Sequence, residues 1–322
     1  MSRRAGLRLL AAGAVIAWFC LFTHWDTTEE SMIRALLAEK TGEGWTVGLL
    51  YQFPEASADA SEAEASIRLC TGRGSQLSAA ITSAEASLPQ CADWHLCEYL
   101  LIEPDSLRQS LSACEELYLT QPYGRLASRV FGTDFSVETL EDRSQESDTF
   151  AENLLQCLKD SATAAPRLYE QSRGFLLPVI ELKKESAVCQ PEALVVTEEH
   201  LEKLPPQQTE MALLLQGKSW TKTGEYPFET ADGTLCLRWA FCGVEKTGEN
   251  FIIRVSALSR KNRSVKAEQE LEDLCEDTLR RCWALGFDLS GLGAMQAQRD
   301  GTLTLTTKNA CPNIQADVQI IN

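Results

Sequence analysis

Apolar residues recur with two different spacings along the chain after residue 30, separated by Gly, Pro and polar turns. Strand-like spacing predicts strands at residues 32–39, 45–53, 96–102, 125–132, 175–182, 193–197, 234–244, 250–258 and 314–321. Helical spacing predicts helices at residues 76–88, 104–117, 150–158, 208–215 and 267–285, a helix that begins at 136, and a short one after 197. Residues 56–64 and 142–150 are polar and are predicted to be loops. Interleaved elements with several adjacent strand pairs favour an α+β fold with largely antiparallel sheets over a doubly wound sheet.

The first 23 residues have the pattern of an export signal. Arg3, Arg4 and Arg8 form a basic tip, and no charged side chain occurs in residues 9–23. The basic end stays in the cytoplasm, so the body is expected outside the membrane. Bulky residues at 18–20 offer no small-x-small cleavage site, which favours a retained signal anchor over a removed signal peptide.

The length of 322 residues exceeds what one hydrophobic core usually organises. We predict a membrane segment at 1–23, an N-terminal domain at 24–183 and a C-terminal region at 184–322. The last region is expected to contain two subdomains that meet near residue 220, which gives three successive mixed α/β domains.

The charge of the chain excludes one class of partner. The formal net charge is −16, and without the three N-terminal arginines 27 basic residues face 46 acidic ones, a charge of −19. A body this acidic is not expected to bind nucleic acid, nor anionic lipid through a basic patch.

Twelve cysteines and three histidines provide no recognisable metal site, because no C-x-x-C spacing occurs. Cys275 and Cys282 lie on the apolar stripe of the helix predicted at 267–285, and Cys236 and Cys242 are expected to share one face of a strand. These positions favour free, buried thiols that act as small apolar residues. One or more disulfides are the alternative, since the body faces an oxidising side.

No catalytic constellation stands out. Gly72-Arg73-Gly74 could cradle phosphate but lacks the Lys-Ser/Thr of a P-loop, so a turn before a helix is favoured. His95 and Cys97 lie two residues apart with no identifiable orienting group. Any acid/base chemistry would rest on carboxylates, among which no pair is distinguished. We therefore expect no catalytic, metal or cofactor site, and no enzyme.

Six short stretches, in order, resemble the C subunits of bacterial spore germinant receptors, the Ger(x)C lipoprotein family. His24-Trp25-Asp26 stands where that family has a lipidated Cys followed by Trp-Asp. The stretches after it are similar to the family's strand and loop motifs: residues 32–37 with Trp45-Thr46-Val47, 95–103, 175–182, 194–199 with 213–218, 286–293, and 311–318.

The resemblance implies three successive α+β domains on the outer face of the spore's inner cytoplasmic membrane. It also implies partnership with a polytopic A-type subunit and a transporter-like B-type subunit in a nutrient-sensing complex that triggers germination. His24 replaces the family's acylated Cys, and Cys20 follows bulky residues, so lipidation at Cys20 is doubtful. A retained peptide anchor is expected in its place.

Two further hypotheses follow from the residues. One is an exported solute-binding ectodomain that captures a nutrient itself, with Trp45, Trp94, Trp220, Trp239 and Trp283 as candidate pocket residues. The other is an exported hydrolase with a carboxylate pair, which would need two acids facing one another in a cleft.

Overall fold

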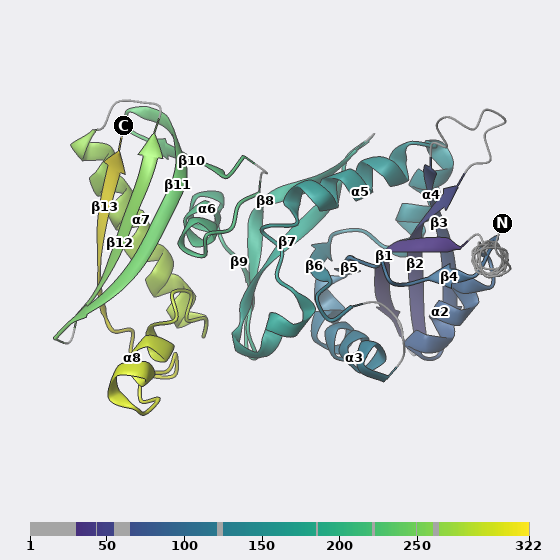
Figure 1. Ribbon diagram of the computed structural model, residues 1–322, viewed down its shortest axis with the longest axis horizontal. Coiled ribbons are helices and arrows are strands. Elements are labelled where there is room, and N and C mark those ends of the chain that lie inside the picture. Colours follow the sequence, from purple (N-terminus) through teal and green to yellow (C-terminus); the bar gives the residue numbers. More distant parts are fainter. Residues whose placement is uncertain are drawn as a thin grey trace, which may run out of the picture.

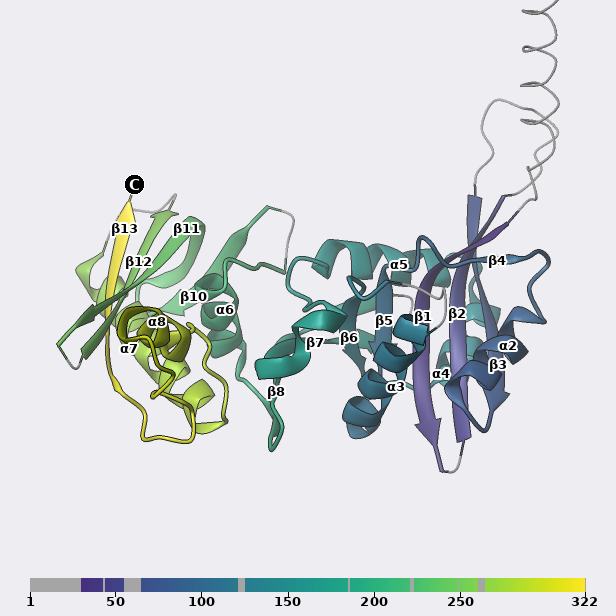
Figure 2. The same cartoon turned by 60° about the horizontal axis from the view of Figure 1, so that its bottom comes forward.

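The computed structural model describes residues 30–42, 44–54, 65–120, 125–184, 186–220, 223–248, 250–259 and 264–321. They form two units built on two separate sheets, which follow one another along the long axis of the molecule (Figure 1, Figure 2). The predicted anchor at 1–23 and its Cys20 lie outside the described residues. Within the described ranges, none of the helices combines the length and the apolar character needed to cross a membrane.

The N-terminal unit is built on a nine-stranded mixed sheet with the order β3-β2-β1-β5-β6-β7-β8-β9, in which β4 pairs with β1. Strands β1, β5, β6 and β7 are parallel, and antiparallel strands flank them on both sides. The strands are β1 (Ser31–Thr41), β2 (Gly44–Pro54), β3 (Ala65–Gly74), β4 (Ala92–Asp93), β5 (Tyr99–Ile102), β6 (Arg129–Thr133), β7 (Phe175–Leu182), β8 (Ala187–Val196) and β9 (Leu201–Lys203).

Helices cover both faces of this sheet. α2 (Leu77–Glu85) and α3 (Leu107–Thr120) pack on one face, and α4 (Val137–Glu146) and α5 (Phe150–Ser161) pack on the other. Two 3₁₀ turns, η1 (Pro104–Ser106) and η2 (Leu168–Arg173), join them to the strands. Successive residues of β1 enter opposite cores, with Leu36 on the α2 side and Leu37 on the α4 side. Burial on both faces explains why the central strands read as continuous apolar runs.

The C-terminal unit is a four-stranded sheet with helices on one face. Its strands are β10 (Glu225–Thr230), β11 (Gly233–Thr247), β12 (Asn250–Ser259) and β13 (Asn313–Ile321), in that order, and only β12 and β13 are parallel. The helices α6 (Pro206–Leu215), α7 (Val265–Ala284) and α8 (Leu292–Asp300) contribute to one core with the inner face of the sheet. Side chains of β7 and β8 join the same core, which links the two units.

Three glutamates of α7 occupy the outer edge of β13. Glu268, Glu272 and Glu276 accept hydrogen bonds from the backbone N–H groups of Ile320, Val318 and Ala316, at 2.9, 3.2 and 3.1 Å. The glutamates are four residues apart on the helix, a rise of about 6.0 Å, and their partners are two residues apart on the strand, a rise of about 6.6 Å. The two spacings are close enough for all three contacts to form. The unpaired edge of β13 is thereby closed by side chains of its own unit.

The structure is α+β with mixed sheets in which antiparallel pairing predominates. The boundary expected at 183/184 falls in the turn between β7 and β8, and the first sheet continues through Lys203. The first sheet ends at Lys203 and the second begins at Glu225, with α6 between them. The division into three domains stays a prediction.

Several elements differ from those predicted. The segment at 65–74 is strand β3, so Gly72-Arg73-Gly74 is not a turn. The chain forms β9 rather than a short helix after 197, α4 continues to Glu146, and β10 and α8 were not predicted. The loop predicted at 56–64 lies outside the described residues.

Cys236 and Cys242 do not share a face of β11. The pairing of β11 with β12 shifts between Arg238 and Phe241, which inserts an extra residue into the strand. Such a bulge reverses the alternation of side chains beyond it. Cys236 is therefore exposed, whereas Cys242 packs against the core and its Sγ lies 3.5 Å from the carbonyl oxygen of Leu214.

Candidate functional site

The thiols of the described residues are free, and five of them are buried. All eleven cysteines in the described ranges are unpaired, and Cys275 and Cys282 lie in the core as predicted. Burial raises the pKa of Cys70 and of Cys282 to about 12. A thiol in that range is protonated near neutral pH, so these cysteines act as small apolar residues rather than as nucleophiles.

His95 and Cys97 do not form a nucleophile–base pair. The side chain of His95 is 89% exposed, and its Nδ1 lies 2.7 Å from Oδ1 of Asp93, an orienting acid that the sequence did not reveal. Cys97 is fully buried, with its Sγ 3.9 Å from the hydroxyl of Tyr118, and burial raises its pKa to about 12. Because His95 is exposed and Cys97 is buried, the imidazole is separated from the thiol.

No metal centre is formed within the described part of the chain, where no three His, Cys, Asp or Glu residues are grouped closely enough to hold an ion.

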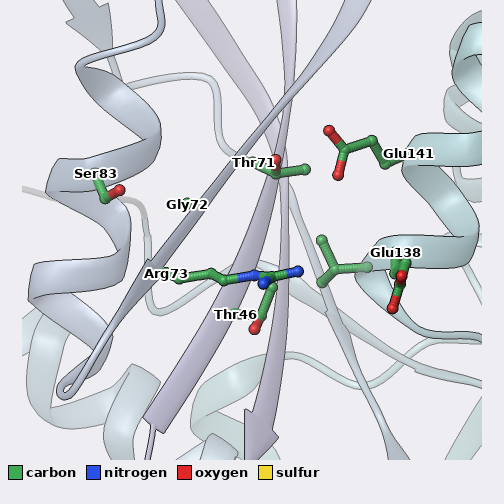
Figure 3. A pocket seen from close by; sticks show the side chains of 8 residues that line it. Thr46, Thr71, Gly72, Arg73, Ser83, Glu138 and Glu141 are labelled. Carbon is green, nitrogen blue, oxygen red and sulfur yellow. The ribbon is translucent and has the colours of Figure 1, made fainter.

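A pocket of about 350 Å³ lies at the β3 edge of the nine-stranded sheet (Figure 3). Thr46 of β2 and Thr71, Gly72 and Arg73 of β3 line its floor, while Ser83 of α2 stands on one side. The remaining lining residues come from α4 and are Val137, Glu138 and Glu141. Arg73 points across the pocket toward α4 (Figure 3).

The two glycines of this strand have a packing role. A Cβ on Gly72 would come within 2.3 Å of the backbone of Ala80 and Ala84, and one on Gly74 within 2.5 Å of the nitrogen of Ala80. Both positions therefore have to be glycine for α2 to lie directly on β3. The pair permits close backbone approach and forms no phosphate cradle.

The outer face of the four-stranded sheet carries exposed aromatic side chains. On β11, Trp239 is 82% and Phe241 is 72% exposed, and Trp239 adopts a left-handed backbone with φ of 50° at the bulge. Leu258 of β12 and Ile321 of β13, which are paired neighbours, are 40% and 50% exposed. We call Trp239, Phe241, Leu258 and Ile321 the open apolar face.

The charged groups beside this face are already paired with one another. Arg254 lies 2.9 Å from Glu245 and 4.0 Å from Asp317, and Arg238 pairs with Glu225. The open apolar face therefore combines large apolar side chains with charges that are neutralised locally. A large apolar area on a soluble surface marks an interaction site.

The five tryptophans proposed for a solute pocket do not gather. Trp45 and Trp94 are buried in the core between the large sheet and α2, and Trp283 is buried in the C-terminal core, against which Trp220 packs. Trp239 stands on the surface. The exposure of Trp239 was not predicted, because the pattern of apolar residues does not indicate the bulge that turns its side chain outward.

Comparisons with known proteins place one solved structure beside this chain. No family model matches it, and no curated protein does. The crystal structure of the GerBC protein is similar, with a TM-score of 0.48 and 13% identity over 89% of this chain and 97% of that chain. The chain resembles the Ger(x)C family. The TM-score of this match is below 0.5, and the resemblance to the family rests on the sequence motifs.

The Ger(x)C-like motifs fall on central elements of both units. The first stretch lies in β1 and β2, and those at 95–103, 175–182 and 194–199 include β5, β7 and β8. The last, around Ile314, opens β13. In the motif at 286–293, Gly286 and Gly291 have φ of 85° and 68°, and Asp288 accepts the N–H groups of Leu292 and Gly293 at 2.8 Å. These motif residues therefore build the fold.

Proposed function

We propose that this chain is a non-enzymatic ectodomain subunit of a germinant-receptor-like complex, and that it couples A-type and B-type membrane subunits as a scaffold in spore germination. The observation that carries the proposal is the ordered set of Ger(x)C-like motifs from Trp25 to the last strand. The buried, protonated thiols and the separated His95 and Cys97 support a non-enzymatic role.

The open apolar face supplies the docking surface in this proposal. Its apolar side chains stand clear of the unit's own core, and the neighbouring charges satisfy one another. A partner that fits it presents an apolar, uncharged protein surface. An anionic membrane surface is the poorer fit, because the chain carries a net charge of −16.

The strained backbone at Trp239 is consistent with a binding role. A left-handed conformation costs a bulky residue roughly 1 kcal/mol. The indole of Trp239 is mostly exposed, so its burial within this unit offsets little of that conformational cost. Burial against a partner would offset the strain, and aromatic anchors of this kind dominate the binding energy of many interfaces.

The proposed location is the outer face of the spore's inner cytoplasmic membrane, with attachment through a retained segment at 1–23. Cys20→Ser should leave the chain in the membrane fraction, because the apolar peptide rather than an acyl chain would hold it there. Release of the variant into the soluble fraction would show that Cys20 carries the anchor.

Affinity isolation of the tagged, full-length chain from spore membranes tests the function. We expect mass spectrometry to identify one A-type and one B-type polytopic subunit with the wild-type chain. The double variant Trp239→Asn, Phe241→Ser should lose them, while Arg143→Gln on α4 should retain them. Isolation of the wild-type chain without either subunit would contradict the proposal.

A further inference from the structure

A second pocket, of about 280 Å³, opens at the amino ends of the parallel strands β5 and β6. Three arginines line it: Arg125, Arg129 and Arg167. Its other lining residues are Cys97, Glu98, Tyr99, Ala127, Ser128 and Ala162. We call this the arginine pocket. Three guanidinium groups converge on it in a chain whose net charge is −16.

The acids near the arginine pocket are already paired with other cations. Glu98, which lines the pocket, lies 3.5 Å from Arg34, and Glu170 lies 3.8 Å from Lys218. Among the described residues, no carboxylate lies within the 4.0 Å ion-pair distance of the three lining guanidinium groups. Asp93 feels the charge of Arg125 over a longer distance, and its Oδ1 lies 2.7 Å from Nδ1 of His95. Within the described part of the chain, the three guanidinium groups therefore make no direct ion pair.

The guanidinium groups of Arg129 and Arg167 are each oriented by one hydrogen bond. Nη1 of Arg129 donates to the carbonyl oxygen of Ala165 at 2.8 Å, and Nη1 of Arg167 donates to the hydroxyl of Tyr169 at 2.7 Å. The Arg167 guanidinium also lies 5.7 Å from the centre of the Tyr169 ring. A guanidinium has five N–H donors, so the others stay available in a fixed orientation.

A fourth cation, Lys218, lies near the pocket and is paired with Glu170 at 3.8 Å. Lys218 follows α6 and lies close enough to Arg129 and Arg167 for both to act on its ammonium group. Burial lowers the pKa of Lys218, and those two arginines lower it further, while Glu170 opposes them. Arg129 and Arg167 thus lie close enough to Lys218 to disfavour its charged form, while its ion-pair partner Glu170 favours that form.

We propose that the arginine pocket binds a small oxyanion that carries at least two negative charges, a di- or tricarboxylate or a phosphate. Planar guanidinium groups pair with two oxygens of a carboxylate or phosphate at once, which suits three arginines around one small cavity. The volume of about 280 Å³ admits such an ion but excludes an extended chain. This proposal goes beyond the role as a scaffold and does not depend on it.

Titration calorimetry of the full chain at low ionic strength, with inorganic phosphate, succinate and citrate as separate probes, tests the site. We expect one probe or more to bind with one-to-one stoichiometry. Arg125→Gln and Arg167→Gln should each weaken that binding about tenfold or more, because a charge-assisted pair is lost. Arg143→Gln, which removes the same charge from α4, is the matched control.

Arg125→Gln carries the test if the Arg167 variant unfolds, because the contacts with the hydroxyl and ring of Tyr169 are made by Arg167. Circular dichroism establishes that each variant is folded. Carboxylate binding without phosphate binding, or the reverse, assigns the oxyanion class. The proposal is overturned if no probe binds at about 10 mM, or if Arg143→Gln weakens binding as much as Arg125→Gln.

Discussion

At the scale of single residues, two glycines decide how closely α2 approaches the sheet. Gly72 faces the backbone of Ala80 and Ala84, and no side chain fits between them. The requirement comes from packing, not from backbone conformation, because neither glycine of β3 has a positive φ. The Gly72-Arg73-Gly74 spacing resembles a phosphate-binding loop in the sequence. In the structure, the two glycines allow α2 to pack directly on β3.

Gly72→Ala should destabilise the protein by about 1–3 kcal/mol, because the added methyl group meets backbone that cannot shift without moving α2. Urea denaturation measures the loss. Gly243→Ala is the control, since a Cβ there meets only the Phe241 ring at an ordinary 3.6 Å. Equal stability of the two variants would show that α2 does not lie directly on β3.

Glu210 of α6 gives the protein a pH-dependent contribution to stability. Burial raises its pKa to about 7, and its Oε2 has no hydrogen-bond partner among the described residues. Between the ordinary Glu pKa and about 7, the folded protein holds a proton that the unfolded chain releases. The contribution to stability is therefore present at low pH and is lost as the pH rises through that range.

Glu210→Gln should flatten this dependence, because a neutral amide releases no proton. We expect the free energy of unfolding to fall less between about pH 5 and about pH 8 in the variant than in the wild type. Glu202→Gln, at an exposed position of β9, serves as control. An unchanged pH profile in Glu210→Gln would mean that the pKa of this carboxyl is the same in the folded protein as in the unfolded chain.

At the scale of elements, helix α7 completes the edge of its own sheet. Its acids at 268, 272 and 276 satisfy the N–H groups of β13 that no strand reaches. Exposed strand edges invite pairing with other chains, and charged side chains across an edge prevent it. Glu268, in the first turn of α7, also suits the positive end of the helix dipole.

Glu272→Ala should lower the free energy of unfolding by about 1–2 kcal/mol, since the N–H of Val318 loses a charged acceptor. Glu272→Gln keeps an acceptor and should lose less. Asp277→Ala, on the exposed side of α7, controls for the loss of an acid. If chemical denaturation shows the same loss in Glu272→Ala and Asp277→Ala, the contact with β13 contributes nothing.

The elements that could be predicted from the sequence are those with strong periodic patterns. The helix at 267–285 and the strands β1, β2, β7 and β12 follow from their apolar spacing. Strand β3 escaped prediction because Arg68, Gly72 and Gly74 break its alternation. The faces of β11 were mistaken because a bulge leaves composition unchanged while it reverses the alternation of the residues after it.

At the scale of the whole molecule, the candidate sites arise from contacts between distant segments. The arginine pocket joins residues that precede β5 and β6 with Arg167, which comes after α5. The open apolar face joins three strands. The motifs and the acidic net charge are evident in the sequence. The grouping of three arginines around one pocket could not be predicted from it, because it depends on contacts between segments that are distant in the chain.

In the proposed assembly, the open apolar face docks a membrane subunit of a germinant-receptor-like complex. Replacing Phe241 with a photo-crosslinking amino acid in the membrane-bound chain tests this docking most directly, with Glu138 on the N-terminal unit as the control position. We predict a crosslink from position 241 to an A-type or B-type subunit and none from position 138. Crosslinks to lipid alone, or equal crosslinks from both positions, would contradict the proposed docking.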